Sequence, residues 1–143
     1  MCLYSKQKRL KIAKKDIVCY KAFEVTNDNS IVTPVFKIRP SIEELEGKKP
    51  FKAVGRTGKY KLFSGFFLDD NDMYEYGRGL IHAYIDKKHV PNNPTSVICK
   101  CRVPKFTRYV TGGGEIAAKK IIIDKIVWDG RAWNGFCYIN NVI

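Results

Sequence analysis

The chain has 143 residues, of which 45% are hydrophobic and 13% aromatic, and its 26 lysines and arginines against 14 aspartates and glutamates give a net charge of +12. This length and apolar content predict one folded domain with its own core and exclude wholesale disorder. No apolar run approaches the ~18 residues of a membrane span, and lysines interrupt the N-terminus where a secretory signal would be apolar. We therefore expect a cytoplasmic protein with reduced cysteines and no membrane partner, whose charge attracts polyanions.

The N-terminal part of the chain predicts a basic head followed by two strands. Residues 1–15 are rich in lysine and weakly patterned, and we interpret them as a basic arm or an edge segment ahead of a single globular domain over 16–143. The Val, Cys, Tyr and Phe of 16–25 predict the first strand of that domain. Residues 31–38 predict a second strand, which Pro34 interrupts or restricts to a sheet edge because proline has no backbone N–H.

A short helix and a glycine-bearing hairpin are predicted next. Ser41 and Glu44 match a capping box, in which two side chains satisfy two otherwise unpaired backbone amides. The helix that they open is expected to end near Gly47, after about two turns. Residues 51–68 combine aromatic, basic and glycine residues, which predicts a loop or hairpin flanked by strands. Residues 79–85 predict a strand that follows a glycine bend.

The C-terminal half of the chain carries the clearest strand patterns. Residues 97–103 alternate with a period of two, and residues 105–111 continue to a glycine turn at 112–114. The β-branched residues of 121–128 predict a further strand, and residues 136–143 predict the last one. Together these elements predict an α+β, mostly β fold: a single domain with an antiparallel or mixed sheet and one or two short helices.

The cysteines of the C-terminal half are interpreted as core residues. Successive side chains of a strand point to opposite faces, so Cys99 and Cys101 share a face with apolar neighbours. A zinc site would need a second pair of ligands, and the spacing of His82 and His89 does not supply one. We therefore expect no metal and no other cofactor. The residues predicted to face inward are Val97, Cys99, Cys101, Val103, Ile121 and Ile123.

The opposite face of the same strand carries Ile98, Lys100 and Arg102. No acid occurs across residues 97–111, and aromatic residues interleave with the basic ones, a combination that holds phosphates while rings stack on bases. The alternative interpretation is an ordinary solvated face. A second basic cluster without acids spans residues 48–61. The candidate nucleic-acid-binding residues are Lys100, Arg102, Lys105, Phe106, Arg108 and Tyr109, together with Lys52, Arg56, Lys59 and Lys61.

These patterns predict a small basic binding protein rather than an enzyme. Its partner is expected to be nucleic acid, RNA ahead of DNA, or a nucleoprotein complex. The chain contains no nucleophile elbow, no recognisable Cys–His pair and no paired-carboxylate motif. The two weak candidates for catalytic residues are His82, in a predicted strand, and Glu115, after the triple glycine. Both are interpreted first as structural or surface residues.

Two segments carry a resemblance to known proteins. The sequences CKCRVPKFTRYVTGGGEIAAKKIIID at Cys99–Asp124 and GLIHAY at Gly79–Tyr84 resemble a loose group of small uncharacterised proteins from bacteria and their phages. Phe106 stands where that group has a glycine. The resemblance assigns no activity by itself. Some phage proteins of this size inhibit host defence complexes, so it implies a phage-encoded inhibitor of a nucleic-acid-guided defence system (an anti-CRISPR protein), with a phage structural protein as an alternative.

The same layout also resembles ADP-ribosyltransferase-like folds. Those folds carry an Arg or His on an early strand and a Glu on a late one. The resemblance implies an alternative function as an enzyme that uses His82 and Glu115. In this chain Tyr20 and Lys21 stand where an aromatic–Arg pair is expected.

Overall fold

The computed structural model describes residues 3–34, 36–62, 73–91 and 95–130. Within these ranges the strands form two antiparallel sheets, of three and nine strands, accompanied by one short helix and a 3₁₀ turn. The mostly β fold is therefore confirmed. The strand predicted for residues 136–143 lies outside the described residues, as does the end of the segment predicted as a hairpin over 51–68.

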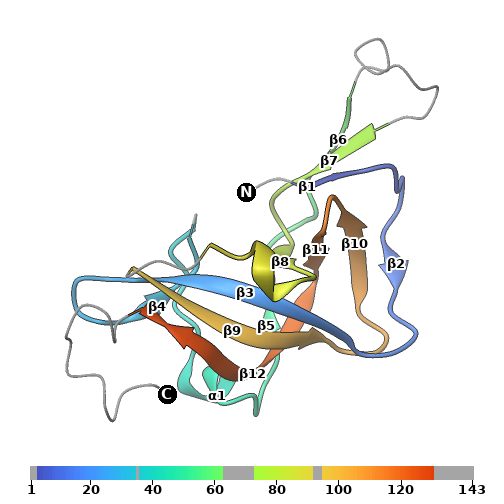
Figure 1. Ribbon diagram of the computed structural model, residues 1–143. Coiled ribbons are helices and arrows are strands. Elements are labelled where there is room, and N and C mark those ends of the chain that lie inside the picture. The colour runs from blue at the N-terminus through green and yellow to red at the C-terminus, as the bar shows by residue number, and fades with distance from the viewer. Residues whose placement is uncertain (1–2, 35, 63–72, 92–94, 131–143) are drawn as a thin grey trace.

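The small sheet has the strand order β1-β7-β6, and Figure 1 shows β6 and β7 extending away from the rest of the protein. The large sheet has the order β2-β10-β11-β8-β3-β9-β12-β5, with β4 paired to β3. The elements are β1 (Leu3–Ser5), β2 (Lys11–Ile12), β3 (Ile17–Val25), β4 (Ile31–Val32), α1 (Ile42–Leu45), β5 (Phe51–Lys52), β6 (Lys59–Leu62), β7 (Met73–Tyr76), β8 (Ile81–Tyr84), η2 (Lys87–His89), β9 (Ser96–Val103), β10 (Arg108–Gly112), β11 (Glu115–Ala118) and β12 (Lys120–Asp129).

The long strands β3, β9 and β12 form the centre of the main core. Cys19 lies opposite Cys101, which in turn lies opposite Ile123, and all three side chains are fully buried. Each buried apolar side chain of Val or Ile size contributes ~1.5–3 kcal/mol to folding. The inward prediction is confirmed, because the following residues all have 0% exposure: Val97, Cys99, Cys101, Val103, Ile121 and Ile123.

The helix α1 forms as predicted but is shorter. The Ser41 side chain accepts from the Glu44 backbone N–H, and the Glu44 side chain accepts from the Ser41 N–H, so both halves of the capping box are present. The helix spans four residues rather than two turns and buries none of them, so no apolar face stabilises a longer helix. Gly47 ends the segment at φ +76°, where an added Cβ would lie 2.6 Å from the Ile123 carbonyl oxygen.

The basic head pairs with both sheets. β1 pairs with β7 of the small sheet, and β2 pairs with β10 at one end of the large sheet. β1 also crosses β10 closely, because Gly112 has no Cβ: an added Cβ would lie 2.0 Å from the Tyr4 carbonyl oxygen. Gln7 fixes the crossing, since its side-chain oxygen accepts from both the backbone N–H and the hydroxyl of Thr111 at 3.1 Å. Leu3 of this head is fully buried.

Candidate functional site

A basic corner forms where the head runs alongside the segment that enters β10. The Ala13 N–H donates to the Thr107 carbonyl at 2.9 Å, and the Phe106 N–H donates to the Ala13 carbonyl at 2.8 Å. This pairing gathers cations that lie about ninety residues apart in the sequence. We define the basic corner as Lys11, Lys14, Lys15, Lys105 and Arg108, with the ring of Phe106.

The five cations of the basic corner are exposed. Within the described ranges, no carboxylate forms an ion pair with any of them. Phe106 is 75% exposed, and the Lys105 ammonium lies 5.0 Å from the centroid of its ring. Its backbone has φ +73°, a conformation that favours glycine and costs other residues ~1–2 kcal/mol. The corner therefore holds a solvent-facing aromatic ring among unpaired positive charges.

Arg102 is paired with two acids, and its role in nucleic-acid binding stays a prediction. Its guanidinium donates to Asp124 at 3.1 Å and to Asp16 at 3.2 Å. The hydrogen bond to Asp124 is the largest cause of the raised pKa of Arg102. The acids were missed because they lie on other strands: β12 has a register shift around Asp124, and Asp16 precedes β3. Lys100 is half-buried on the same strand.

The predicted role of Tyr109 in base stacking stays a prediction, and its surroundings limit how much of the ring a base could reach. Tyr109 is half-buried and packs against the main core, so its ring is not a free stacking surface. The candidates of the second basic cluster are divided among three places. Lys52 lies on β5 opposite Lys120 of β12, and Arg56 lies in the connection that follows. The residue after Lys52, Ala53, donates its N–H to the Lys119 carbonyl at 2.8 Å, and the Lys119 N–H donates to the carbonyl of Arg108 at 3.0 Å, so β5 ends close to the basic corner.

Lys59 and Lys61 of that cluster lie on β6 of the small sheet. The Lys59 ammonium donates to the carbonyl of Lys8 at 2.8 Å and lies 5.3 Å from the ring centroid of Tyr74. These contacts hold part of the basic head against the small sheet. The head thus carries positive charge to the small sheet at one end and to the basic corner at the other.

His82 and Glu115 lie on neighbouring strands. In the register of β8 and β11, His82 is opposite Ala117 and Glu115 is opposite Tyr84, so the two candidates sit diagonally on one face of the sheet. His82 is 8% exposed, and its Nε2 lies 2.7 Å from the Gly77 carbonyl oxygen. Burial lowers the pKa of His82 and raises the pKa of Glu115. This environment favours a neutral imidazole that donates to Gly77.

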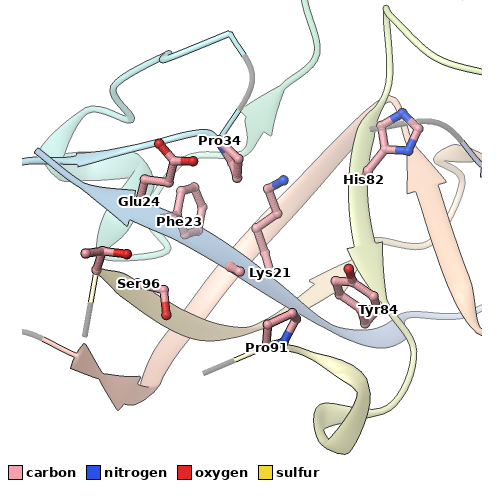
Figure 2. A pocket seen from close by; sticks show the side chains of 10 residues that line it. Lys21, Phe23, Glu24, Pro34, His82, Tyr84, Pro91 and Ser96 are labelled. Atoms are coloured by element: carbon pink, nitrogen blue, oxygen red, sulfur yellow. The ribbon is translucent and has the colours of Figure 1, made fainter. Parts of the chain in front are cut away.

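A pocket of about 210 Å³ opens between β3, β8 and the start of β9, and Figure 2 shows Lys21 extending into it from β3. Lys21 is 6% exposed, and burial lowers its pKa to about 8. Sequence reasoning missed this residue as a site, although the alternation of β3 places it on the inward face with Cys19 and Phe23. The lining residues are Lys21, Ala22, Phe23, Glu24, Pro34, His82, Tyr84, Pro91, Thr95 and Ser96.

The described cysteines are free and buried, and burial raises the pKa of Cys19 to about 12. Thiols in this state are protonated and act as small apolar groups. In the described part of the chain, no three His, Cys, Asp or Glu side chains are grouped so that they would hold a metal ion. None of the helices in the same ranges is long and apolar enough to span a membrane.

Comparisons with known proteins assign no family to the chain, so a proposal for its function rests on the fold and the basic corner. No protein-family model matches the chain, and no match to it emerged among curated proteins or solved structures.

Proposed function

We propose that the chain is a nucleic-acid-binding protein that contacts the phosphate backbone through the basic corner. The observation that carries the proposal is the pairing of residues 11–13 with 106–109, which brings five exposed, unpaired cations from two distant segments to one end of the sheet, with the Lys105 ammonium 5.0 Å from the centroid of the exposed Phe106 ring. Cations that neutralise phosphates release counterions, and this release drives association with any polyanion. A nucleoprotein complex with an exposed strand would engage the same corner.

Single-stranded RNA is the proposed first partner. A ring that is 75% exposed and in contact with a lysine ammonium matches the arrangement in which an unpaired base stacks while its phosphates are neutralised. Bases in single-stranded RNA loops and ends are available for such stacking, whereas those in a duplex are already stacked. We therefore expect tighter binding to a single strand than to a duplex of the same length.

The test measures binding of a fluorescent oligouridine of about 15 nucleotides by anisotropy across a salt series. Five phosphate contacts on a single strand predict a slope of log K against log salt of about −3.5. The variant Lys14→Ala, Lys15→Ala, Lys105→Ala removes three of the contacts and should lower the magnitude of the slope by about 2. The Lys105 backbone N–H, which donates to Asp16 at 2.8 Å, is unaffected by this change.

The matched control removes three exposed lysines elsewhere: Lys49, Lys87 and Lys125. Both variants have the same net charge. If they lose affinity equally, overall charge rather than the basic corner is responsible and the proposed site is wrong. If the unaltered protein binds no oligouridine at low salt, the proposed function itself is wrong.

A further inference from the structure

The buried ammonium of Lys21 has no anionic partner among the residues that the structure describes. Among the described residues, no carboxylate or carbonyl accepts a hydrogen bond from it, and the contact that is present is with the ring of Phe23, 5.9 Å from ring centroid to nitrogen. Lys21 is nine-tenths buried and lies at the wall of a pocket rather than in solid packing. An unpaired buried charge is strongly unfavourable, so an anion that enters the pocket gains an interaction that the protein does not supply.

The size and walls of the pocket define the body of such an anion. A cavity of 150 Å³ lined by apolar side chains holds benzene, so a pocket of about 210 Å³ has room for one ring and a small charged group. Phe23, Tyr84, Pro34 and Pro91 line it, and these side chains present flat or rigid surfaces. A strand of nucleic acid is too large for this volume.

The charges around the pocket favour a single negative charge on the ligand. Lys21 supplies one positive charge, and His82 is favoured in its neutral form by burial. Glu24 also lines the pocket and forms an ion pair with Lys37. A doubly charged phosphate would leave one charge without a partner next to this acid, whereas one carboxylate matches one ammonium.

We propose that this pocket binds a small monocarboxylate with a flat apolar body, whose carboxylate pairs with Lys21 and whose body packs against Phe23 and Tyr84. The site is separate from the basic corner. β9 begins at the pocket with Ser96 and ends beside the corner at Val103, and eight extended residues span more than about 20 Å. Loss of one site therefore leaves the other to be measured.

Several other titratable groups surround Lys21. Cys19 belongs to the same strand, Cys99 lies opposite Lys21 in the register with β9, and Cys101 is the next inward residue of β9. The thiols of Cys19 and Cys101 are uncharged near neutral pH, since burial raises the pKa of Cys19 to about 12 and that of Cys101 well above its usual value. On β8, burial raises the pKa of Tyr84. Between pH 7 and 9.5 the main change in charge at the pocket is therefore that of Lys21.

The experiment titrates benzoate into the protein at pH 7 and follows backbone amide shifts by NMR, with benzamide and phenyl phosphate as comparison ligands. We expect saturable shifts at residues of β3 and β8, and weaker binding of benzamide by about tenfold or more, because it lacks the charge. Lys21→Met should weaken benzoate binding by a similar factor, whereas the exposed Lys87→Met should not change it. Oligouridine binding should be unchanged by Lys21→Met.

A second measurement needs no variant of the pocket. The affinity of the unaltered protein for benzoate should fall by about tenfold between pH 7 and pH 9.5, because the Lys21 amine loses its proton. Absence of saturable binding would overturn the proposal. So would equal affinity in Lys21→Met, tighter binding of phenyl phosphate than of benzoate, or an affinity that does not change with pH.

Discussion

Replacing Lys21 with Met should make the protein more stable at neutral pH. Methionine has a similar length and fills irregular apolar space, so it retains the packing of the lysine stem while removing the buried charge. The ammonium is desolvated and lacks an anionic partner among the described residues. The substitution therefore removes an unfavourable contribution rather than a stabilising contact.

The magnitude follows from the pKa of Lys21, which burial lowers from 10.5 to about 8. One pKa unit corresponds to ~1.4 kcal/mol, so keeping this amine charged in the folded state costs ~3 kcal/mol. Below pH 8 the amine is charged in both states and the full cost is present. Between pH 8 and 10.5 the unfolded chain still binds the proton that the folded protein has lost, so stability rises with pH. The advantage of Met should fall to ~1 kcal/mol at pH 9.5.

Urea denaturation of the unaltered protein and of Lys21→Met at pH 7 and pH 9.5 measures this effect. Cys19 acts in the opposite direction, because above pH 9 its thiol ionises in the unfolded chain while the folded one stays protonated to about pH 12. The Lys21 charge lowers the pKa of Cys19, so Lys21→Met raises that pKa further, and Cys19 stays protonated in both folded proteins at pH 7 and pH 9.5. Its contribution is therefore the same in both and cancels in the difference. A variant that is less stable at pH 7, or a difference that stays constant with pH, would refute the reasoning.

Three further outcomes are expected. In a Cys2→Ser, Cys137→Ser background, the remaining thiols are those of Cys19, Cys99 and Cys101, which are fully buried. They should react with a maleimide at least about a hundredfold more slowly in the folded protein than in denaturant. Equal rates would show that the inward assignment is wrong. Phe106→Gly should leave the free energy of unfolding within ~1 kcal/mol or raise it, because glycine relieves the positive φ. The same variant should bind oligouridine about tenfold more weakly, because the ring is lost. Unchanged affinity would exclude stacking. Gln7→Ala should lower the free energy of unfolding by ~1–2 kcal/mol through the two lost Thr111 hydrogen bonds, as measured by urea denaturation, whereas Gln7→Glu retains the acceptor.

Local patterns were sufficient to predict several parts of this fold. The alternation over residues 97–103 identified the buried face of β9, because a strand repeats every two residues whatever its neighbours are. The capping box was likewise predicted, since Ser41 and Glu44 interact within one helical turn. Both features depend on contacts between residues close in sequence.

The candidate site depends on contacts between residues distant in the sequence, and local patterns did not predict which charges these contacts bring together. Lys14 and Lys15 join Lys105 only because the head pairs with the segment before β10. Arg102 is neutralised by Asp16 and Asp124, which belong to other strands. A segment without acids in its own sequence can therefore still lie beside acids in the sheet.

The site at Lys21 was also missed because it depends on residues distant in the sequence. Lys21 lies on the inward face of β3, and this position was not predicted from the sequence, because lysine is almost never fully buried without a partner. The pocket that makes this position possible is formed by β8 and β9, some sixty to seventy-five residues further along the chain. No pattern within β3 indicates that pocket.

The hydrogen bonds that hold the head against β10 have a consequence for the rate at which the protein folds. Ser5 donates to the Thr111 carbonyl, 106 residues further along, and Gln7 contacts the same residue. The head is therefore held by contacts with residues about a hundred positions further along the chain, and contacts of such long sequence separation slow folding.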